Sequence, residues 1–133
     1  MSQENVNTVR AVYEEWGKGN FRAGVDLYDP LVLFVAHPNM PEAGHYLGID
    51  DIQRFFRGYL NPWENLTFAA DEQLIETQNS VVVAVHQQGI GRESGIPTEI
   101  RFFHVWTFRG RAVIRLETFP DRAEALEAVG LSE

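Results

Sequence analysis

Cysteine is absent from this chain of 133 residues. The absence excludes a disulfide framework, a thiol nucleophile and a zinc–thiolate site. Long apolar runs are absent too, since the longest, such as residues 31–36 and 81–85, have only the length of strands and cannot cross a bilayer. The N-terminal segment is polar and has no apolar core of the signal-peptide kind. We therefore expect a soluble, cytoplasmic protein.

Positive charge is scarce. Lys and Arg number 11 against 19 Asp and Glu, which gives a formal net charge of −8. This balance argues against nucleic acid, whose phosphates attract basic patches, and against an anionic membrane surface as partners. With 44% hydrophobic and 23% charged residues, the chain has an ordinary globular composition and is long enough for one hydrophobic core. We expect a single domain over residues 1–133.

Helical periodicity marks the first part of the chain. Apolar residues recur at helical spacing up to Trp16, and the glycines at positions 17 and 19 end this first helix. A short second helix is expected over residues 21–27. A third helix is expected to be capped by Asp50 or Asp51 and closed by Pro62. Residues 37–45, which contain two prolines and a glycine, are expected to form an irregular loop.

Strand patterns dominate the rest. Residues 31–36 have the length and residue types of a buried strand, and from residue 65 onward the apolar period changes to two. Further strands are predicted over residues 65–77, 80–91, 98–108 and 112–119. Asp121 and Glu124 resemble a capping box that opens a short terminal helix through Val129. This order of elements predicts an α+β fold in which helices cover one face of a curved, mostly antiparallel sheet.

The last two strands form a predicted hairpin around an Arg-Gly-Arg turn, and they hold the most informative residues. Because side chains alternate along a strand, His104 shares a face with apolar neighbours only: Ile100, Phe102, Trp106 and Phe108. Folding at Gly110 is expected to bring His104 near Arg115 and Glu117. The sequence thus predicts a titratable cluster inside an apolar pocket.

The opposite face of the same strand is apolar as well, because it carries Phe103 and Val105. We expect one face to pack on the helices and the other, convex face to pack on a second subunit. The predicted assembly is a homodimer.

The layout resembles the nuclear transport factor 2-like superfamily and, within it, the branch of SnoaL-like polyketide cyclases and ketosteroid isomerases. The resemblance spans most of the chain and rests on the segments 9–16, 27–30, 46–48, 52–55, 104–108 and 115–117. It implies a cone-shaped α+β roll whose sheet wraps a deep pocket closed by helices, and it implies dimers.

The resemblance also implies site residues. SnoaL-type cyclases carry a catalytic aspartate where this chain has Glu117, and ketosteroid isomerases carry a protonated aspartate where it has His104. The chain departs from the isomerases at the general base, where residues 35 and 36 are Val and Ala. The isomerase tyrosine matches Val12 by spacing, with Tyr13 adjacent. The Asp-Arg-Asp set of limonene epoxide hydrolases is not found.

Two interpretations of this cluster remain open. Glu117 could act as a base with His104 as the acid or oxyanion donor, since an imidazole beside a carboxylate suits acid–base chemistry. Alternatively, Glu117, Arg115 and His104 satisfy one another as a buried ionic network. Arg115 either neutralises Glu117 or binds an anionic or enolate oxygen.

Other polar and aromatic residues are secondary candidates. His86 and His37 either line the pocket mouth or sit in solvent at strand ends, and no short-spaced ligand pair predicts a metal. Trp63 belongs to an aromatic set of which most members are expected to be core. The full set of expected substrate-binding side chains is Arg115, Tyr13, Trp16, Phe55, Phe56, Tyr59, His86, Phe102 and Trp106.

We therefore expect a cofactor-independent enzyme of the SnoaL-like type. It would catalyse proton transfer (isomerisation, cyclisation or water addition) on a compact hydrophobic substrate. The alternative is a non-catalytic ligand-binding or dimerisation domain of the same fold, and a third possibility is a pocket that is merely structural.

Overall fold

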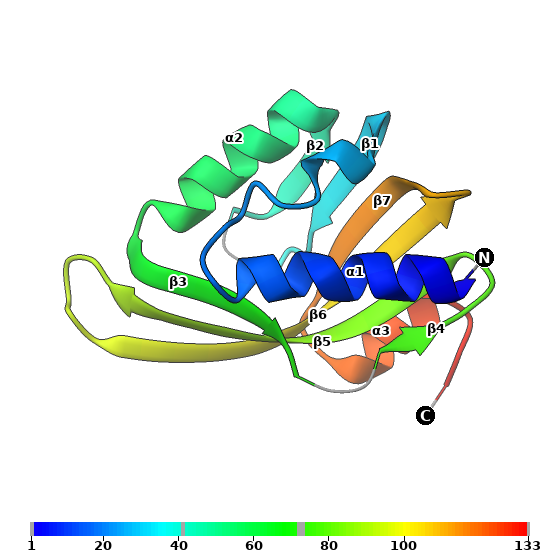
Figure 1. Cartoon of the computed structure of the whole chain (residues 1–133). Coiled ribbons are helices and arrows are strands. Elements are labelled where there is room, and N and C mark those ends of the chain that lie inside the picture. Colours follow the sequence, from blue (N-terminus) through cyan, green and yellow to red (C-terminus); the bar gives the residue numbers. More distant parts are fainter. Residues whose placement is uncertain (1, 41, 72–73, 133) are drawn as a thin grey trace.

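The computed structural model describes residues 2–40, 42–71 and 74–132. Figure 1 shows the arrangement of its helices and strands. In chain order they are α1 (Ser2–Trp16), the 3-10 helix η1 (Val25–Leu27), β1 (Tyr28–Ala36), β2 (Gly44–Leu47), α2 (Ile49–Leu60), β3 (Trp63–Ala70), β4 (Ile75–Glu76), β5 (Ser80–Gly91), β6 (Pro97–Arg109), β7 (Ala112–Phe119) and α3 (Arg122–Ala128).

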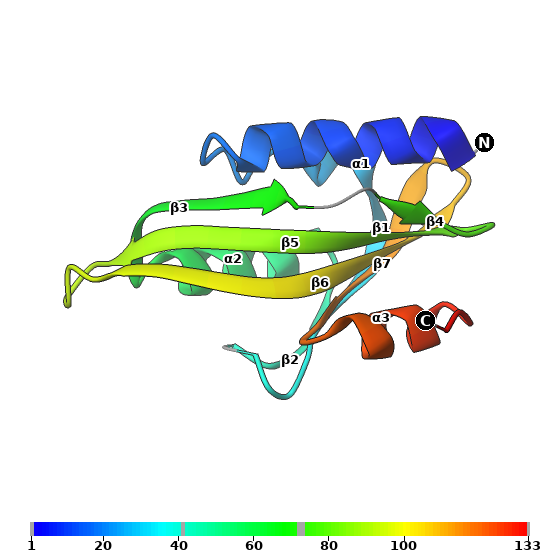
Figure 2. The ribbon, with the colours of Figure 1, turned by 90° about the horizontal axis from the view of Figure 1, so that it is seen from below.

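A curved sheet organises the molecule. Its strand order is β2-β1-β7-β6-β5-β3, with β4 paired to β5. The β1–β7 pair is parallel and the other pairs are antiparallel. Helices α1 and α2 cover the concave side, called the inner face below, whereas α3 lies against the opposite, outer face (Figure 2). Within the described ranges, no helix is both long enough and apolar enough to cross a membrane.

The predicted fold class is confirmed, and several elements have the predicted limits. Strands β5 and β7 coincide with the predicted ranges 80–91 and 112–119. The first helix ends at Trp16, as the glycines predicted. Asp121 caps α3, because its carboxylate accepts a hydrogen bond from the backbone N–H of Glu124 at 2.9 Å. The glycines after Trp16 and the capping residue Asp121 were therefore sufficient to predict where these two helices end and begin.

Other elements differ from the prediction. Residues 21–27 form turns that end in η1 and not a regular helix, because Gly24 adopts a left-handed conformation with φ 92°. The predicted loop 37–45 contributes its end to β2, and the predicted strand 65–77 is divided into β3 and β4. Gly48, and neither aspartate, precedes α2. The carboxylate of Asp51 instead accepts from the N–H of Leu47 and pairs with Arg54.

The register of the last hairpin differs from the prediction in a way that changes the site. Ile114 has no partner on β6, because the pairing passes from Phe108–Val113 directly to Thr107–Arg115. This β-bulge adds one residue to β7, and a shift of one residue moves every later side chain to the other face. His104 therefore lies opposite Thr118 on the inner face, while Glu117 lies opposite Val105 on the outer face.

Helix α3 corrects the interpretation of the outer face. Ala125 of α3 packs with Val82 and Val105, and Val105 is only 1% exposed. The apolar side chains that seemed to require a second subunit are thus covered, at least at Val105, by the chain itself. The homodimer stays a prediction.

Candidate active site

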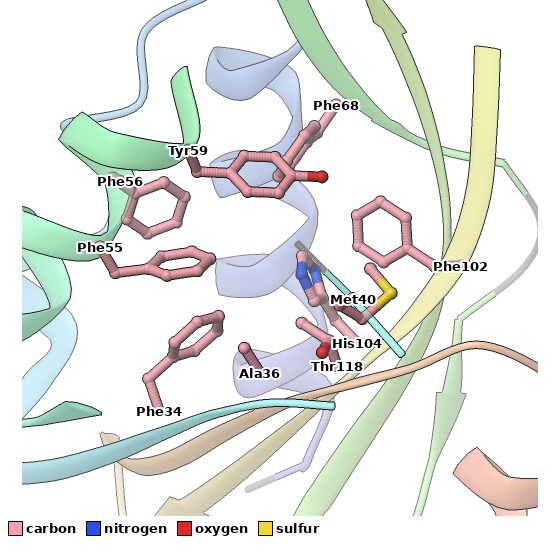
Figure 3. A pocket seen from close by; sticks show the side chains of 10 residues that line it. All are labelled: Phe34, Ala36, Met40, Phe55, Phe56, Tyr59, Phe68, Phe102, His104 and Thr118. Atoms are coloured by element: carbon pink, nitrogen blue, oxygen red, sulfur yellow. The ribbon is translucent and has the colours of Figure 1, made fainter. Parts of the chain in front are cut away.

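A narrow cavity lies between the sheet and α2 on the inner face. Its volume is about 10 Å³, which is close to the minimum for one water. Met40, from the loop after β1, lines the cavity and is partly exposed to solvent. Figure 3 shows the lining side chains, which are Phe34, Ala36, Met40, Phe55, Phe56, Tyr59, Phe68, Phe102, His104 and Thr118.

His104 is the most unusual of these residues, because it is a titratable group that is only 2% exposed. Its imidazole lies edge-on to Phe102, with 5.1 Å between the ring centroids, and contacts the rings of Phe68 and Trp16. Alternation along β6 aims it at the inner face, as predicted. A polar ring in such apolar surroundings needs a specific partner.

That partner is Tyr13 of α1. Its hydroxyl lies 2.5 Å from Nδ1 of His104 and accepts a hydrogen bond of 2.9 Å from the indole N–H of Trp106. No other described residue accepts the phenolic proton of Tyr13, and a buried hydroxyl needs an acceptor, so we assign this proton to the bond with the imidazole. Nδ1 is therefore the acceptor, and the ring proton of neutral His104 is on Nε2.

Burial keeps both groups neutral. Desolvation lowers the pKa of His104 to about 3, because the charged imidazolium is disfavoured in an apolar site. The same effect raises the pKa of Tyr13 well above its ordinary value, more than its bond with Trp106 lowers it. At neutral pH Tyr13 and His104 are therefore both uncharged, and the imidazole is a neutral N–H donor.

The free end of the imidazole opens onto the cavity. Nε2 of His104 makes no hydrogen bond with another described residue. In the described ranges, every side-chain nitrogen or oxygen that is fully buried has a hydrogen-bond partner. Nε2 has none, so this atom is not fully buried. The cavity that His104 lines supplies this space, and a ligand oxygen there would complete the hydrogen bonding of the ring.

Two further polar groups face the cavity. The hydroxyl of Tyr59 is committed, because it donates to the side-chain oxygen of Gln87 at 2.5 Å, and burial raises its pKa to about 12. The hydroxyl oxygen of Thr118 accepts the backbone N–H of His37 at 2.9 Å. Since a hydroxyl both accepts and donates, Thr118 keeps a proton for a ligand.

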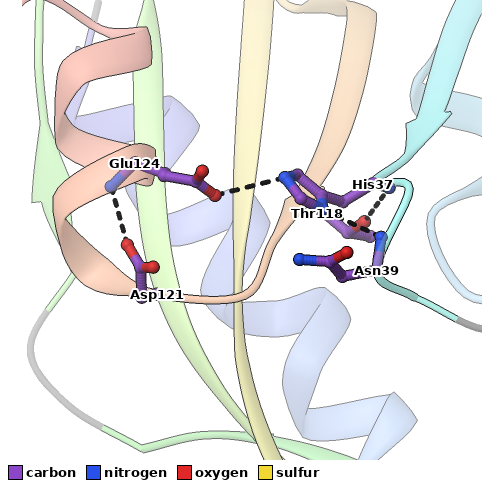
Figure 4. A network of polar contacts seen from close by, with 5 residues as sticks. All are labelled: His37, Asn39, Thr118, Asp121 and Glu124. Atoms are coloured by element: carbon purple, nitrogen blue, oxygen red, sulfur yellow. Dashed lines mark hydrogen bonds and ion pairs between the residues drawn. The ribbon is translucent and has the colours of Figure 1, made fainter.

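The contact with Thr118 continues to the outer face. Figure 4 shows that His37 lies between Thr118 and α3, where its Nε2 is 3.2 Å from the carboxylate of Glu124. The Nδ1 atom of His37 accepts the backbone N–H of Asn39 at 3.1 Å. His37 thus belongs to the support of the loop that carries Met40, and it does not line the cavity.

Glu117 and Arg115 are not in the cavity, which corrects the predicted cluster. They form a two-contact ion pair on the outer face, with Nε–Oε1 at 3.0 Å and a second contact of 3.2 Å. The side chains are 17% and 46% exposed respectively. Neither the acid–base pair of Glu117 with His104 nor the three-residue network is formed, because the bulge at Ile114 turned both charges outward.

The other candidates divide into three groups. Phe55, Phe56, Tyr59 and Phe102 line the cavity. Tyr13, Trp16 and Trp106 pack behind His104 and do not line it. His86 is on the outer face, 2.8 Å from the carboxylate of Glu99, and Trp63 starts β3 outside the cavity.

Sequence reasoning missed half of the lining. The missed residues are Phe34, Ala36, Met40, Phe68 and Thr118. Alternation along β1 and β3 was a signal for Phe34, Ala36 and Phe68, whereas Thr118 was hidden by the bulge and Met40 by its irregular loop. Among the described residues, no group of three or more His, Cys, Asp or Glu side chains is placed to hold a metal ion.

Comparison with known proteins identifies the class. The SnoaL-like domain family matches residues 9–116, so the chain belongs to this family. No curated protein matches the chain.

Solved structures agree on the fold. A nuclear transport factor 2-like protein of unknown function from Burkholderia pseudomallei K96243 is 25% identical, with a TM-score of 0.78 and coverage of 98% of this chain and 99% of that one. A putative SnoaL-like polyketide cyclase from Jannaschia sp. CCS1 is 22% identical, with a TM-score of 0.76 and coverage of 96% and 90%. A protein with a ketosteroid isomerase-like fold from Catenulispora acidiphila DSM 44928 is 15% identical, with a TM-score of 0.72 and coverage of 98% and 95%.

The bond between Tyr13 and His104 predicts a large stability effect. Tyr13→Phe removes the proton donor of Nδ1 and the acceptor of the Trp106 N–H, and each buried group left without a partner costs about 1–3 kcal/mol. For a domain of this size we expect the melting temperature to fall by roughly 5–15 °C. The matched control is Tyr28→Phe, because the hydroxyl of buried Tyr28 bonds to no other described residue. Equal melting temperatures for both variants would contradict a stabilising role of the Tyr13 hydroxyl.

The protonation of His104 gives a prediction on pH. The folded pKa of about 3 lies below the unfolded value near 6.5, so the unfolded chain takes up this proton first as the pH falls. Stability due to this group is complete above about pH 6.5 and decreases by about 1.4 kcal/mol per pH unit towards pH 3. Imidazole ¹⁵N signals should show an Nε2–H tautomer that does not titrate while the chain is folded. A titration midpoint near pH 6 would refute this.

Proposed function

We propose that the protein binds a compact, neutral, mostly apolar molecule in the cavity and holds one oxygen of that molecule against the Nε2–H of His104. The observation that carries this proposal is the bond from Tyr13, which fixes the tautomer and leaves a single N–H donor facing an apolar space. A carbonyl oxygen is the acceptor that fits best, because it needs one donor and brings no charge into the site.

The lining favours a neutral ligand. None of its side chains is a carboxylate, an arginine or a lysine, and burial keeps His104 uncharged. A charged ligand would lose its hydration without gaining a counter-ion. Thr118 is paired with His104 in the register, and its hydroxyl offers a second donor. Two donors on adjacent strands would orient the oxygen and leave the rest of the ligand to the aromatic rings.

Binding with polarisation is favoured over proton transfer. A neutral imidazole that donates to a carbonyl oxygen withdraws charge from it, as an oxyanion hole does. Abstraction of a proton requires a base as well, and Nδ1 of His104 is occupied by Tyr13 while Glu117 is on the other face. Of the two functions expected from the sequence, we therefore propose the ligand-binding one.

Two proteins of the same fold support small-molecule binding. The protein from Catenulispora acidiphila was crystallised in complex with trimethylamine. TerC, which is 23% identical with a TM-score of 0.75 and coverage of 88% and 91%, was co-crystallised with polyporic acid. The ligands differ, which is consistent with a shared cone whose lining sets the chemistry in each protein.

Acetophenone and ethylbenzene test the role of His104, since they differ mainly by the carbonyl oxygen. In NMR titrations the wild type should prefer acetophenone by about fivefold, the value of one hydrogen bond of about 1 kcal/mol. The preference should vanish in His104→Phe. Because that change leaves the Tyr13 hydroxyl without its acceptor, Tyr13→Phe/His104→Phe is a second background. Met40→Ala should strengthen the binding of both ligands, because it enlarges the cavity.

The same ligand separates binding from catalysis. In D₂O, exchange of the acetophenone methyl protons requires a base, so the wild type should not accelerate it above the rate in buffer. Acceleration that is lost in His104→Phe would overturn the binding proposal in favour of proton transfer. An unchanged preference for acetophenone in both histidine variants would overturn the contact with His104.

We also propose that two copies pair through the outer face at β1 and β2. Leu31 and Leu47 are 75% and 57% exposed, and Leu33 pairs with Leu47 in the register. Val32 is fully buried, whereas Leu31 and Leu33 on either side of it are exposed and partly exposed, so we place both leucines on the outer face. With Leu47 they form an apolar strip at the edge that α3 does not cover. A second copy would bury this strip.

Sedimentation tests the assembly. The wild type should be a dimer at micromolar concentration, and Leu31→Glu or Leu47→Glu should produce a monomer with an unchanged fold. Ile96→Glu is the matched control, because Ile96 is 60% exposed but lies in the turn between β5 and β6. A monomeric wild type, or a monomer produced equally by Ile96→Glu, would contradict the proposed face.

A further inference from the structure

An open cleft lies on the other side of Phe56 from the cavity. It runs between α2 and the segment that connects α1 to β1, which face one another in Figure 1. Its volume is about 580 Å³, far more than that of the cavity. The cleft is lined by Gly19, Asn20, Phe21, Arg22, Val25, Tyr28, Ile52, Gln53, Phe56, Arg57 and Leu60.

Two arginines line this cleft from opposite walls. Arg22 belongs to the connecting segment and Arg57 to α2, and both are exposed. Neither guanidinium forms an ion pair or a hydrogen bond with another described residue. Most basic side chains behave differently, and those in ion pairs are Lys18, Arg54, Arg92, Arg101, Arg109, Arg111 and Arg115.

The charge of the cleft is opposite to that of the protein. The formal net charge is −8, yet no carboxylate is among the lining residues. Arg10 of α1 is likewise without an ion pair among the described residues, but it lies outside the cleft. Two cations that have no counter-ion among the described residues, in an acidic protein, create a local preference for an anion.

Tyr28 adds an independent observation. It is only 7% exposed and lines the cleft, and its hydroxyl bonds to no other described residue. In the described ranges, every side-chain oxygen that is fully buried has a hydrogen-bond partner, so the unpartnered hydroxyl of Tyr28 is accessible to solvent. The cleft is the open space that Tyr28 lines. Burial raises the pKa of Tyr28, so the hydroxyl remains a donor.

The connecting segment is held in a defined shape. The indole N–H of Trp16 donates to the backbone oxygen of Ala23 at 3.2 Å. The backbone N–H of Asn20 donates to the backbone oxygen of Glu15, and its side-chain amide donates to the carboxylate of the same residue, both at 3.0 Å. These bonds flank Arg22 on both sides, so the wall that carries it is preorganised.

We propose that this cleft is a second ligand site, which takes a small carboxylate with an aromatic or aliphatic body. The planar forks of Arg22 and Arg57 match the two oxygens of a carboxylate, and the Tyr28 hydroxyl supplies a further donor from the floor. Apolar side chains on both walls, Val25 among them on one and Ile52 on the other, contact the body of the ligand.

The second site differs from the cavity in ligand charge and in residues. The cavity takes a neutral ligand on His104, whereas the cleft takes an anion on two arginines. Phe56 is the residue that lines both. Benzoate therefore tests the cleft and acetophenone tests the cavity, so either proposal can fail without the other.

Benzoate titration of the wild type tests the proposal, with the side-chain Nε–H signals of the arginines followed by NMR. The signals of Arg22 and Arg57 should shift and that of Arg10 should not. Arg22→Gln and Arg57→Gln should each weaken the binding of benzoate by about tenfold, and raising the salt concentration should weaken this binding further. The matched control is Arg10→Gln, which changes the net charge equally and should leave the affinity unchanged. Tyr28→Phe should weaken benzoate severalfold without lowering the melting temperature.

Neutral and inorganic probes complete the test. Benzamide, which keeps the ring but lacks the charge, should bind at least tenfold more weakly than benzoate. Equal binding of benzamide and benzoate, equal loss in Arg10→Gln and Arg22→Gln, or no benzoate-dependent shift at the two arginines would each overturn the site. Inorganic phosphate binding as tightly as benzoate would overturn the assignment of a carboxylate with an apolar body.

Discussion

The hydrogen bond between Tyr13 and His104 joins the first helix to the middle of the sheet, and the interior of the cone is arranged around it. A histidine buried to 2% exposure is tolerated only because a phenolic proton satisfies Nδ1 and burial keeps the ring neutral. The indole N–H of Trp106 donates to the phenolic oxygen, and no other described residue accepts the phenolic proton, which we therefore assign to the bond with Nδ1. The packing of an aromatic core and the polarity of the cavity are consequences of the same three side chains.

This arrangement places His104 and the charged pair of Arg115 and Glu117 on opposite faces of the sheet, whereas the sequence predicted them in one pocket. The interior keeps a neutral donor, and the fixed charges of β7 are outside, where Arg115 and Glu117 neutralise one another in partial contact with water. Such a pair contributes little stability, about 1 kcal/mol or less, but its burial in the cone would have cost more than it gained. The bulge at Ile114 produces the separation, because it reverses the facing of every residue after it.

Local patterns in the sequence were sufficient for most of the fold and for half of the site. The alternation of β6 predicted the facing of His104, and the cap at Asp121 predicted α3. The errors arose where facing depends on an irregularity with no sequence signature. A bulge residue such as Ile114 is an ordinary β-branched residue, so alternation carried through it gave the wrong face for Glu117. Similarly, the position of α3 over Val105 is a tertiary contact, and an apolar strand cannot tell whether a helix or a second subunit will cover it.

The small volume of the cavity follows from the same packing. Aromatic rings from α2 and the sheet meet at van der Waals contact around His104, for example Phe34 and Phe55 with 4.5 Å between ring centroids. Close packing stabilises the fold but leaves room for little more than a water, so ligand entry requires a side chain that can change its rotamer at low cost. Met40 fits this requirement, because it is unbranched, flexible and partly exposed, and it belongs to a loop and not to the sheet. His37 supports the loop that carries Met40, and its backbone N–H donates to the hydroxyl of Thr118. Thr118 therefore contacts the base of this loop and also lines the cavity.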